Sequence, residues 1–382
     1  MGLSRSASPR LGVHAVALAC AALSLQCGTR SSAPAKASPS APGGLDEQCS
    51  AGNARACSEL GKQLRADAPE RAEALFQRAC DSGDAPGCGA LGELRIAQED
   101  YAAARALYDR ACKGKHADAC NDLGVLYAKG VGGPQDFERA RSYYRRACDA
   151  GQFLGCANLG ALVAKGIGGA ADLSQAHALF EKACRGGSGL GCYNLAHQLA
   201  NGIGVDKNVE QAVRLYAKAC DAKTAEACGA LGWMFEEGEA VPRDPSRARK
   251  LFERGCDGRH GDSCAELGQM LREGRGGDAN EGRARELYAR ACELASGAGC
   301  TNLGTALASG MGGAADFAAA RGAFQRACDA GDATGCYDLA QLLETDRGGA
   351  PDVDAARRLY QRACAQGEAD ACAKAQGGAP SK

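Results

Sequence analysis

Aromatic residues are scarce in this sequence, since Trp occurs once and Phe, Trp and Tyr together make up 5% of the 382 residues. Surfaces that stack on nucleic-acid bases need several exposed rings, so no such surface is expected. An excess of one charge is also lacking, because 45 Lys and Arg residues stand against 46 Asp and Glu residues. Binding to phosphate backbones requires a basic excess. We therefore expect no nucleic-acid partner.

The sequence also lacks the motifs of common catalytic and metal sites. It holds only five His, and neither Cys-x-x-Cys nor His-x-His occurs. Zinc sites usually join Cys and His ligands at short spacings, and redox enzymes use Cys-x-x-Cys. The Ser-x-x-Lys and Lys-Thr-Gly motifs of penicillin-recognising enzymes are missing as well. We expect no metal, no cofactor and no catalytic residue.

The first residues have the pattern of an export signal. Arg5 and Arg10 precede an apolar run from Leu11 to Leu25, which is shorter than the roughly 20 residues that span a bilayer. A short positive segment followed by a short apolar run is typical of a secretory signal peptide. We predict a signal peptide over residues 1–26.

Cys27 directly follows this run, and a Ser-, Pro- and Ala-rich stretch extends from it to Gly44. A Cys at the cleavage point followed by a polar tether resembles a bacterial lipoprotein signal. Ser24 and Gln26 stand where that signal prefers Leu and a small residue, Cys20 is a second candidate, and plain secretion is the alternative. We expect lipidation at Cys27, a flexible tether over 27–44, and membrane contact only through the lipid. The expected location is the periplasm, the outer membrane or the cell surface.

The remaining twenty Cys form ten pairs whose members are eight residues apart. From Cys112 onward the pairs recur every 36 residues, and such a fixed period indicates a repeat array. The pairs are Cys49-Cys57, Cys80-Cys88, Cys112-Cys120, Cys148-Cys156, Cys184-Cys192, Cys220-Cys228, Cys256-Cys264, Cys292-Cys300, Cys328-Cys336 and Cys364-Cys372.

Each repeat unit contains two amphipathic segments. Before the first Cys, Ala140, Tyr143, Tyr144, Ala147 and Cys148 follow helical spacing and form one apolar stripe. After the second Cys we expect a shorter helix that ends at a Gly in the left-handed conformation, as at Gly166. Asp residues precede the next helix as N-caps, as at 136 and 172. This pattern predicts nine helical hairpins between Cys57 and Cys364.

The spacing of eight favours disulfides within each pair. Residues eight apart in one helix are separated by about 12 Å, whereas a disulfide requires Cα atoms within about 7 Å. The segment between the partners must therefore turn back, and it contains turn residues such as Asp149, Ala150 and Gly151. The rival scheme joins Cys120 with Cys148 and leaves Cys49 and Cys372 without partners. Export also implies an oxidising compartment.

Two amphipathic helices per 36 residues, with Leu-Gly in one and turns such as Gly166-Ile167-Gly168 after it, resemble the Sel-1-like repeat. The Cys pairs are similar to those of the Helicobacter cysteine-rich proteins of this family. The resemblance covers about residues 45–374 and leaves 375–382 as a disordered C-terminus. It implies an all-α fold, an α-solenoid (superhelix) of about nine helical hairpins with disulfide-stapled junctions.

For function, the resemblance implies a scaffold that binds a protein or peptide ligand through a curved surface, and we expect a monomer. Two alternatives stay open. One is a penicillin-binding or weakly β-lactamase-like hydrolase, because some cysteine-rich members are described in that way. The other is a structural spacer in the cell envelope.

Candidate binding residues precede the Leu of the Leu-containing helix. In the related tetratricopeptide repeats, Asn side chains on this helix hold peptide groups, which implies a role here for Asn158, Asn194 and Asn302. The alternative is that these residues lie in the first helical turn and satisfy free N–H groups. Trp233 belongs to the one aromatic cluster on such a helix and either anchors a ligand or packs in the core.

Overall fold

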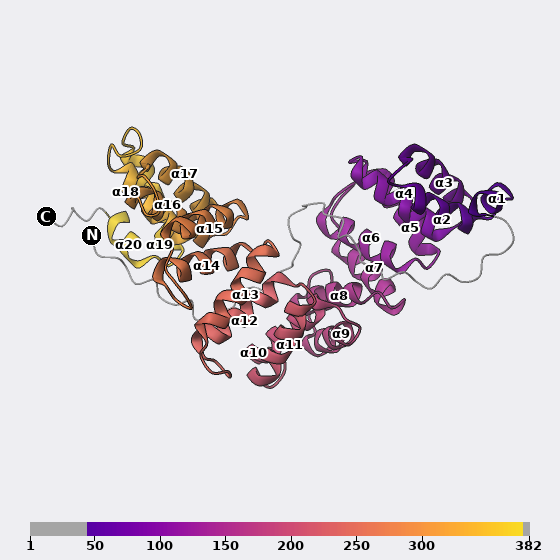
Figure 1. The fold of residues 1–382 in the computed structure, drawn as a ribbon, viewed down its shortest axis with the longest axis horizontal. Coiled ribbons are helices and arrows are strands. Elements are labelled where there is room, and N and C mark those ends of the chain that lie inside the picture. Colours follow the sequence, from indigo (N-terminus) through magenta and orange to yellow (C-terminus); the bar gives the residue numbers. More distant parts are fainter. Residues whose placement is uncertain (1–43, 377–382) are drawn as a thin grey trace. The chain divides into compact units, whose positions relative to one another are not determined.

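The computed structural model describes residues 44–376, and this part of the chain contains twenty α-helices and no β-strand (Figure 1). The all-α architecture expected from the sequence is therefore confirmed. The expected signal peptide (1–26), the lipidation site Cys27 and residues 27–43 of the tether lie outside the described residues. Residues 377–382 of the expected C-terminal tail also lie outside them, while the last helix extends to Ala375.

Eighteen of these helices form nine hairpins, flanked by the short helices α1 (Leu45–Ser50) and α20 (Ala369–Ala375). The first helices of the hairpins are α2 (Ala54–Leu64), α4 (Ala85–Ala97), α6 (Ala117–Lys129), α8 (Phe153–Lys165), α10 (Gly189–Asn201), α12 (Ala225–Glu237), α14 (Gly261–Glu273), α16 (Gly297–Ser309) and α18 (Ala333–Leu343). The second helices are α3 (Pro69–Asp81), α5 (Tyr101–Lys113), α7 (Phe137–Asp149), α9 (Leu173–Arg185), α11 (Val209–Asp221), α13 (Pro245–Asp257), α15 (Glu281–Glu293), α17 (Phe317–Asp329) and α19 (Val353–Ala365).

The hairpins belong to two compact units. Unit 1 is Met1–Gln198 with Gly202–Asp206, and unit 2 is Leu199–Asn201 with Lys207–Lys382. Within the described residues, unit 1 contains α1 to α9 and most of α10, and unit 2 contains α11 to α20.

The sequence defines both ends of each helix. Asp136 and Asp172 cap the second helices α7 and α9 by accepting hydrogen bonds from the backbone N–H groups of Arg139 and Gln175, as the sequence predicted. Gly166 ends α8 in the left-handed conformation, with φ of 67°. The expectation of a shorter first helix is wrong, because α8 and α9 both contain 13 residues. The first helix starts inside the segment between the two Cys, where Gln152 caps it.

In seven of the nine hairpins an aromatic ring packs on a glycine of the facing helix, and Ala196 takes the glycine position in the hairpin of Tyr216. In α8 and α9, a Cβ on Gly160 would lie 2.7 Å from Cε1 of Phe180. The same pairing recurs at Gly304 and Phe324, while Ala340 takes the glycine position in the hairpin of Tyr360. The Gly of the Leu-Gly motif thus lets the two helices approach with a large ring between them.

Eight disulfides join the end of a second helix to the start of the next first helix, and two more join α1 to α2 and α19 to α20. All ten expected pairs are bonded, with Cα–Cα distances of 4.4 to 4.7 Å. Among the described residues, Cys120 is therefore joined to Cys112 and not to Cys148. The bridges lie at the junctions between hairpins, where the sequence placed them.

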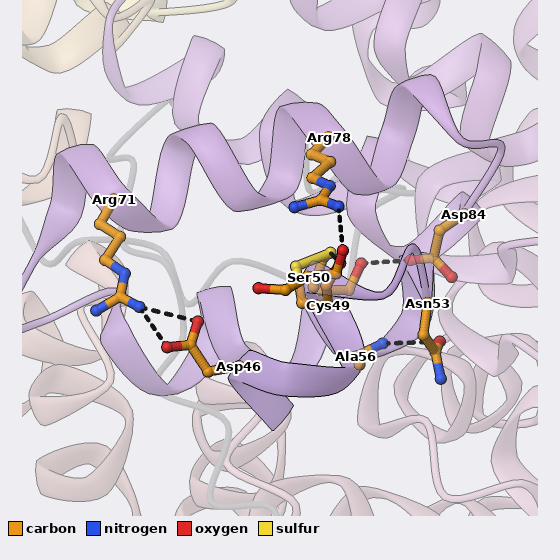
Figure 2. Close-up of a disulfide and its surroundings, with 10 residues drawn as sticks. Asp46, Cys49, Ser50, Asn53, Ala56, Arg71, Arg78 and Asp84 are labelled. Carbon is orange, nitrogen blue, oxygen red and sulfur yellow. Dashed lines mark hydrogen bonds and ion pairs between the residues drawn. A yellow bond between two sulfur atoms is a disulfide. The ribbon is translucent and has the colours of Figure 1, made fainter. Parts of the chain in front are cut away.

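An Arg two positions before the first Cys strengthens many junctions. Arg146 and Arg290 donate to the backbone carbonyls of Cys112 and Cys256, each at 2.9 Å. At the first junction Arg78 instead donates to the carbonyl of Ser50 at 3.1 Å, beside the Cys49 disulfide (Figure 2). These charge-assisted bonds satisfy carbonyls near helix C-termini and tie one hairpin to its neighbour.

A second Arg reaches the turn that leads to the following second helix. Arg285 donates to the carbonyl of Ala314 at 3.0 Å, and a Cβ on Gly313 would lie 2.6 Å from its Nη1. In two repeats both members of this pair are replaced. His177 and Val205 take the places of the Arg and the Gly in one repeat, and Val213 and Val241 take them in the next. The Arg and the Gly therefore occur together or are absent together.

Candidate interaction surface

Each first helix exposes one narrow face. On α14 Asp262 and Glu273 are exposed, Glu266, Gln269 and Arg272 are half-buried, and the other positions are buried. Asp262, Glu266, Gln269 and Glu273 follow the spacing i, i+4, i+7 and i+11. The equivalent positions on α12 are Glu226, Ala230, Trp233 and Glu237. Helical spacing puts these four positions on one side of each helix. We call this face the first-helix stripe.

Hydrogen bonds connect successive first helices near their N-terminal ends, so neighbouring stripes lie side by side. In unit 2, Ser296 donates to Asp262 at 2.7 Å and Thr301 donates to Asp332 at 2.9 Å. In unit 1, the Asn158 amide donates to Oδ1 of Asn121 at 3.0 Å. The stripes of α14, α16 and α18 in unit 2, and those of α6 and α8 in unit 1, are therefore adjacent.

Two carboxyl groups on the stripes of unit 2 have perturbed acidity. Burial raises the pKa of the half-buried Glu266 to about 7, against the opposing effect of Arg275. Burial also raises the pKa of Asp338 to about 7, and the carboxylates of Asp332 and Glu368 add to this rise. Near neutral pH both groups therefore carry a partial negative charge at the surface of unit 2.

A buried ion network lies below the stripe of α14. Glu236, which is 4% exposed, accepts hydrogen bonds at Oε1 from Arg275 at 2.5 Å and from Arg243 at 3.3 Å. Arg275 also pairs with Glu273 at 2.7 Å. The position that corresponds to Glu236 is occupied by Ala164 and Ala308 in two other hairpins. In the last hairpin it is Glu344, which accepts from Tyr360 and Lys374, so of these equivalent positions only Glu236 pairs with two Arg.

Three of the four predicted binding residues lie on first-helix stripes, and the fourth, Asn194, has the equivalent position on α10 but is buried. Asn158, Asn302 and Trp233 are half-buried, and the indole ring of Trp233 packs edge-on against Phe252 at 5.6 Å between centroids. Asn194 is only 3% exposed, so its side chain is covered in the structure. Trp233 is thus both a packing residue and part of the surface.

The alternative role of these residues as first-turn caps is wrong. Asn158 is the sixth residue of α8, whereas the cap of that helix is Gln152. The sequence pattern found one position of each stripe but missed the others, such as Asp262, Gln269 and Glu273. Their i, i+4, i+7 and i+11 spacing was the available signal.

A serine–histidine contact occurs in unit 2, where His260 Nδ1 lies 2.8 Å from Oγ of Ser263. Ser263 is 1% exposed, and its hydroxyl fits against the Cα atoms of Gly229 and Gly255, which have no side chain in the way. A nucleophile must reach its substrate, so this buried hydroxyl acts as a packing group. Within residues 44–376, no cluster of three or more His, Cys, Asp or Glu could hold a metal ion.

Comparison with protein families gives a consistent result along most of the chain. The model of the family described as Sel1 repeat matches nine segments: residues 50–84, 90–116, 117–152, 154–188, 189–223, 225–260, 261–296, 297–332 and 333–368. No curated protein sequence matches the chain significantly.

Two solved structures share the fold. A protective antigen of uropathogenic Escherichia coli with an SLR fold is 21% identical at a TM-score of 0.64, with 87% of this chain and 73% of the antigen covered. A Sel1 repeat protein from Oxalobacter formigenes is 22% identical at a TM-score of 0.55, with 63% of this chain and 96% of that protein covered. In the described part of the chain, no helix has the length and apolar character required to cross a bilayer.

Proposed function

The chain belongs to the Sel1 repeat family, and we propose that it is an exported scaffold that binds proteins or peptides through its first-helix stripes. Sel1 repeats form scaffolds that typically mediate protein interactions. The observation that carries the proposal is the recurrence of a polar, partly exposed stripe on successive first helices. Repeat arrays gain binding area with each added unit, without a new core.

The cysteines support the exported location. Ten disulfides indicate an oxidising, exported environment, because cytosolic thiols are kept reduced. We propose further that the mature chain is a monomer anchored by lipid at Cys27 and faces the periplasm or the cell surface. Intact-mass measurement of the native protein tests the anchor: an unmodified N-terminus, or unchanged membrane association of Cys27→Ala, contradicts it.

Site-specific photo-crosslinking tests the binding surface. Ala298 lies exposed on the stripe of α16, and Ala319 lies exposed on the second helix α17. A photo-reactive amino acid at either position replaces a small exposed side chain, so folding should be equally affected. We expect crosslinks to envelope proteins from position 298, reduced by an excess of unlabelled protein, and few from position 319. Equal crosslinking from both positions contradicts the proposal.

A further inference from the structure

The first-helix stripes of unit 2 carry carboxyl groups and no basic side chain, while the half-buried Arg272 adjoins Glu273 at the end of α14. Fifteen positions on α12, α14, α16 and α18 form these stripes, and none is Lys or Arg: Glu226, Ala230, Trp233, Glu237, Asp262, Glu266, Gln269, Glu273, Ala298, Asn302, Thr305, Ser309, Thr334, Asp338 and Gln341. The stripes of unit 1 differ, because α6 and α8 carry Lys129 and Lys165 besides Asp118 and Asp122. The negative face is therefore a property of unit 2.

Most of these carboxyl groups are not neutralised by the protein itself. Glu273 is paired with Arg272 and Arg275, both at 2.7 Å. Within the described residues the other five acidic members of the stripes make no ion pair; they are Glu226, Glu237, Asp262, Glu266 and Asp338. Burial is the main cause of the raised pKa values of Glu266 and Asp338, and neighbouring carboxylates raise both values further.

Two buried oxygens under the stripe of α14 have unused hydrogen-bonding capacity. Oε2 of Glu236 and the hydroxyl of Tyr288 are buried and have no hydrogen-bond partner. Both belong to the same group of charges, because Glu236 acts on the pKa of Glu266, while Glu266 and Glu273 act on that of Tyr288. Unpaired buried polar atoms are rare in folded proteins. Tyr288 is 0% and Glu236 is 4% exposed, so these two oxygens leave uncompensated polarity beneath the stripe but do not themselves contact a ligand at the surface.

Trp233 adds a surface suited to cations. Its half-buried ring lies on the stripe of α12, one helical turn from both Ala230 and Glu237. Ammonium and guanidinium groups are attracted to aromatic faces, most strongly to Trp. The same stripe therefore offers a carboxylate and an aromatic ring to one cationic side chain.

We propose that the first-helix stripes of α12, α14, α16 and α18 bind a Lys- or Arg-rich peptide segment of a protein partner. This inference rests on the proposed function and names the partner chemistry for unit 2. Five unpaired carboxylates spread over three helices match several cationic side chains on one extended segment. A single small cation matches this arrangement less well, and no metal-ligating cluster exists in the described residues.

Binding of labelled peptides to the full-length oxidised protein tests the proposal. The probes are a fluorescein-labelled peptide of alternating Lys and Gly and two peptides of equal length, in which Glu or Ser replaces Lys. We expect the Lys peptide to bind, the Glu and Ser peptides to bind much more weakly, and added salt to weaken the Lys complex because it screens exposed charges.

Paired variants locate the binding surface. Glu266→Gln with Asp338→Asn removes two carboxylates from the stripes, whereas Glu253→Gln with Glu293→Gln removes two exposed carboxylates from the second helices α13 and α15. Exposed ion pairs are individually weak, so we expect the first double variant to lower the affinity for the Lys peptide by about three- to tenfold. The control double variant should change affinity by less than about twofold.

The possible failures are distinguishable. Equal loss of affinity in both double variants, or complete displacement of the Lys peptide by spermine at equal charge concentration, overturns the proposal in favour of non-specific attraction. Preferential binding of the Ser or Glu peptide with loss on stripe substitution overturns the inference but supports the proposed function. Absence of binding by any peptide, together with absence of crosslinks from position 298, contradicts both.

Discussion

At the scale of single residues, the glycines opposite aromatic rings have a packing role that the exposed glycines lack. A Cβ on Gly304 would lie 2.5 Å from Cε1 of Phe324, whereas Gly322 on α17 has no atom within 4 Å of such a Cβ. Both glycines belong to the hairpin of α16 and α17, and both lie within helices. They form a matched pair in which only the contact with the ring differs.

We predict opposite effects for the two Ala substitutions. Gly304→Ala should lower the free energy of unfolding by about 1–2 kcal/mol, because overpacking a buried ring outweighs the gain in helix propensity. Gly322→Ala should raise it by about 0.5–1 kcal/mol, since only the backbone entropy changes. Denaturant unfolding of the oxidised protein measures both. Equal stabilisation by the two substitutions would contradict the prediction. It would mean that Phe324 can shift to accept a methyl group, as Tyr360 accepts Ala340 in its own hairpin.

Glu266 should make the protein less stable as the pH rises, whereas a carboxylate in an ion pair makes it more stable. Its pKa is raised from 4.5 in a free carboxyl to about 7, so the folded state holds the proton more tightly than the unfolded state. The contribution of Glu266 is therefore fully present below about pH 4.5 and is lost as the pH rises through 7. Glu266→Gln should stabilise the protein by about 1–3 kcal/mol at pH 8 and change little at pH 4.

Thermal unfolding of Glu266→Gln and the wild type at both pH values measures this difference. Glu253→Gln on the second helix α13 is the control, because Glu253 is an exposed carboxylate away from the stripes. A stabilisation of Glu266→Gln that is equal at pH 4 and pH 8 would show that burial of the charge is not its cause.

At the scale of helices and hairpins, the sequence predicted the number of hairpins because their boundaries depend on local signals. Paired Cys, left-handed Gly and Asp caps each act within a few residues, as Gly166 and Asp172 show. The start of the first helices was missed because their caps, such as Ser188, Ser296 and Asp332, lie inside the segment between the two Cys, where the sequence indicated only a turn. The stripes were found only in part, because exposure of a first-helix position depends on the neighbouring hairpins, which the local sequence does not specify.

The joint occurrence of Arg and Gly predicts a coupling between elements. Gly313→Val should displace Arg285 from the turn and lower the free energy of unfolding by about 1 kcal/mol, because the bond to the Ala314 carbonyl is lost. Adding Arg285→Val, which reproduces the natural pair Val213 and Val241, should cost little more. A double-mutant cycle measures the coupling, and strictly additive losses would contradict it.

At the scale of the whole molecule, the bridges should hold the junctions in register. Each hairpin contacts mainly its sequence neighbours, and short helices are marginal alone. Removing the bridge of unit 2 that joins α11 to α12, by Cys220→Ser with Cys228→Ser, should loosen this junction and leave distant hairpins folded. Hydrogen exchange should show lost protection near residues 207–240. Unchanged exchange there would show that packing alone holds the junction.

The central claim is that the first-helix stripes are the binding face of this scaffold, and carboxyl footprinting tests it most directly. The full-length oxidised protein is labelled with a carbodiimide and an amine, with and without solubilised envelope proteins. We predict reduced labelling of Glu226, Asp262 and Asp338 on the stripes, and unchanged labelling of Glu253 and Glu293 on the second helices. Protection of Glu253 and Glu293 with continued labelling of the stripe carboxylates would contradict the claim.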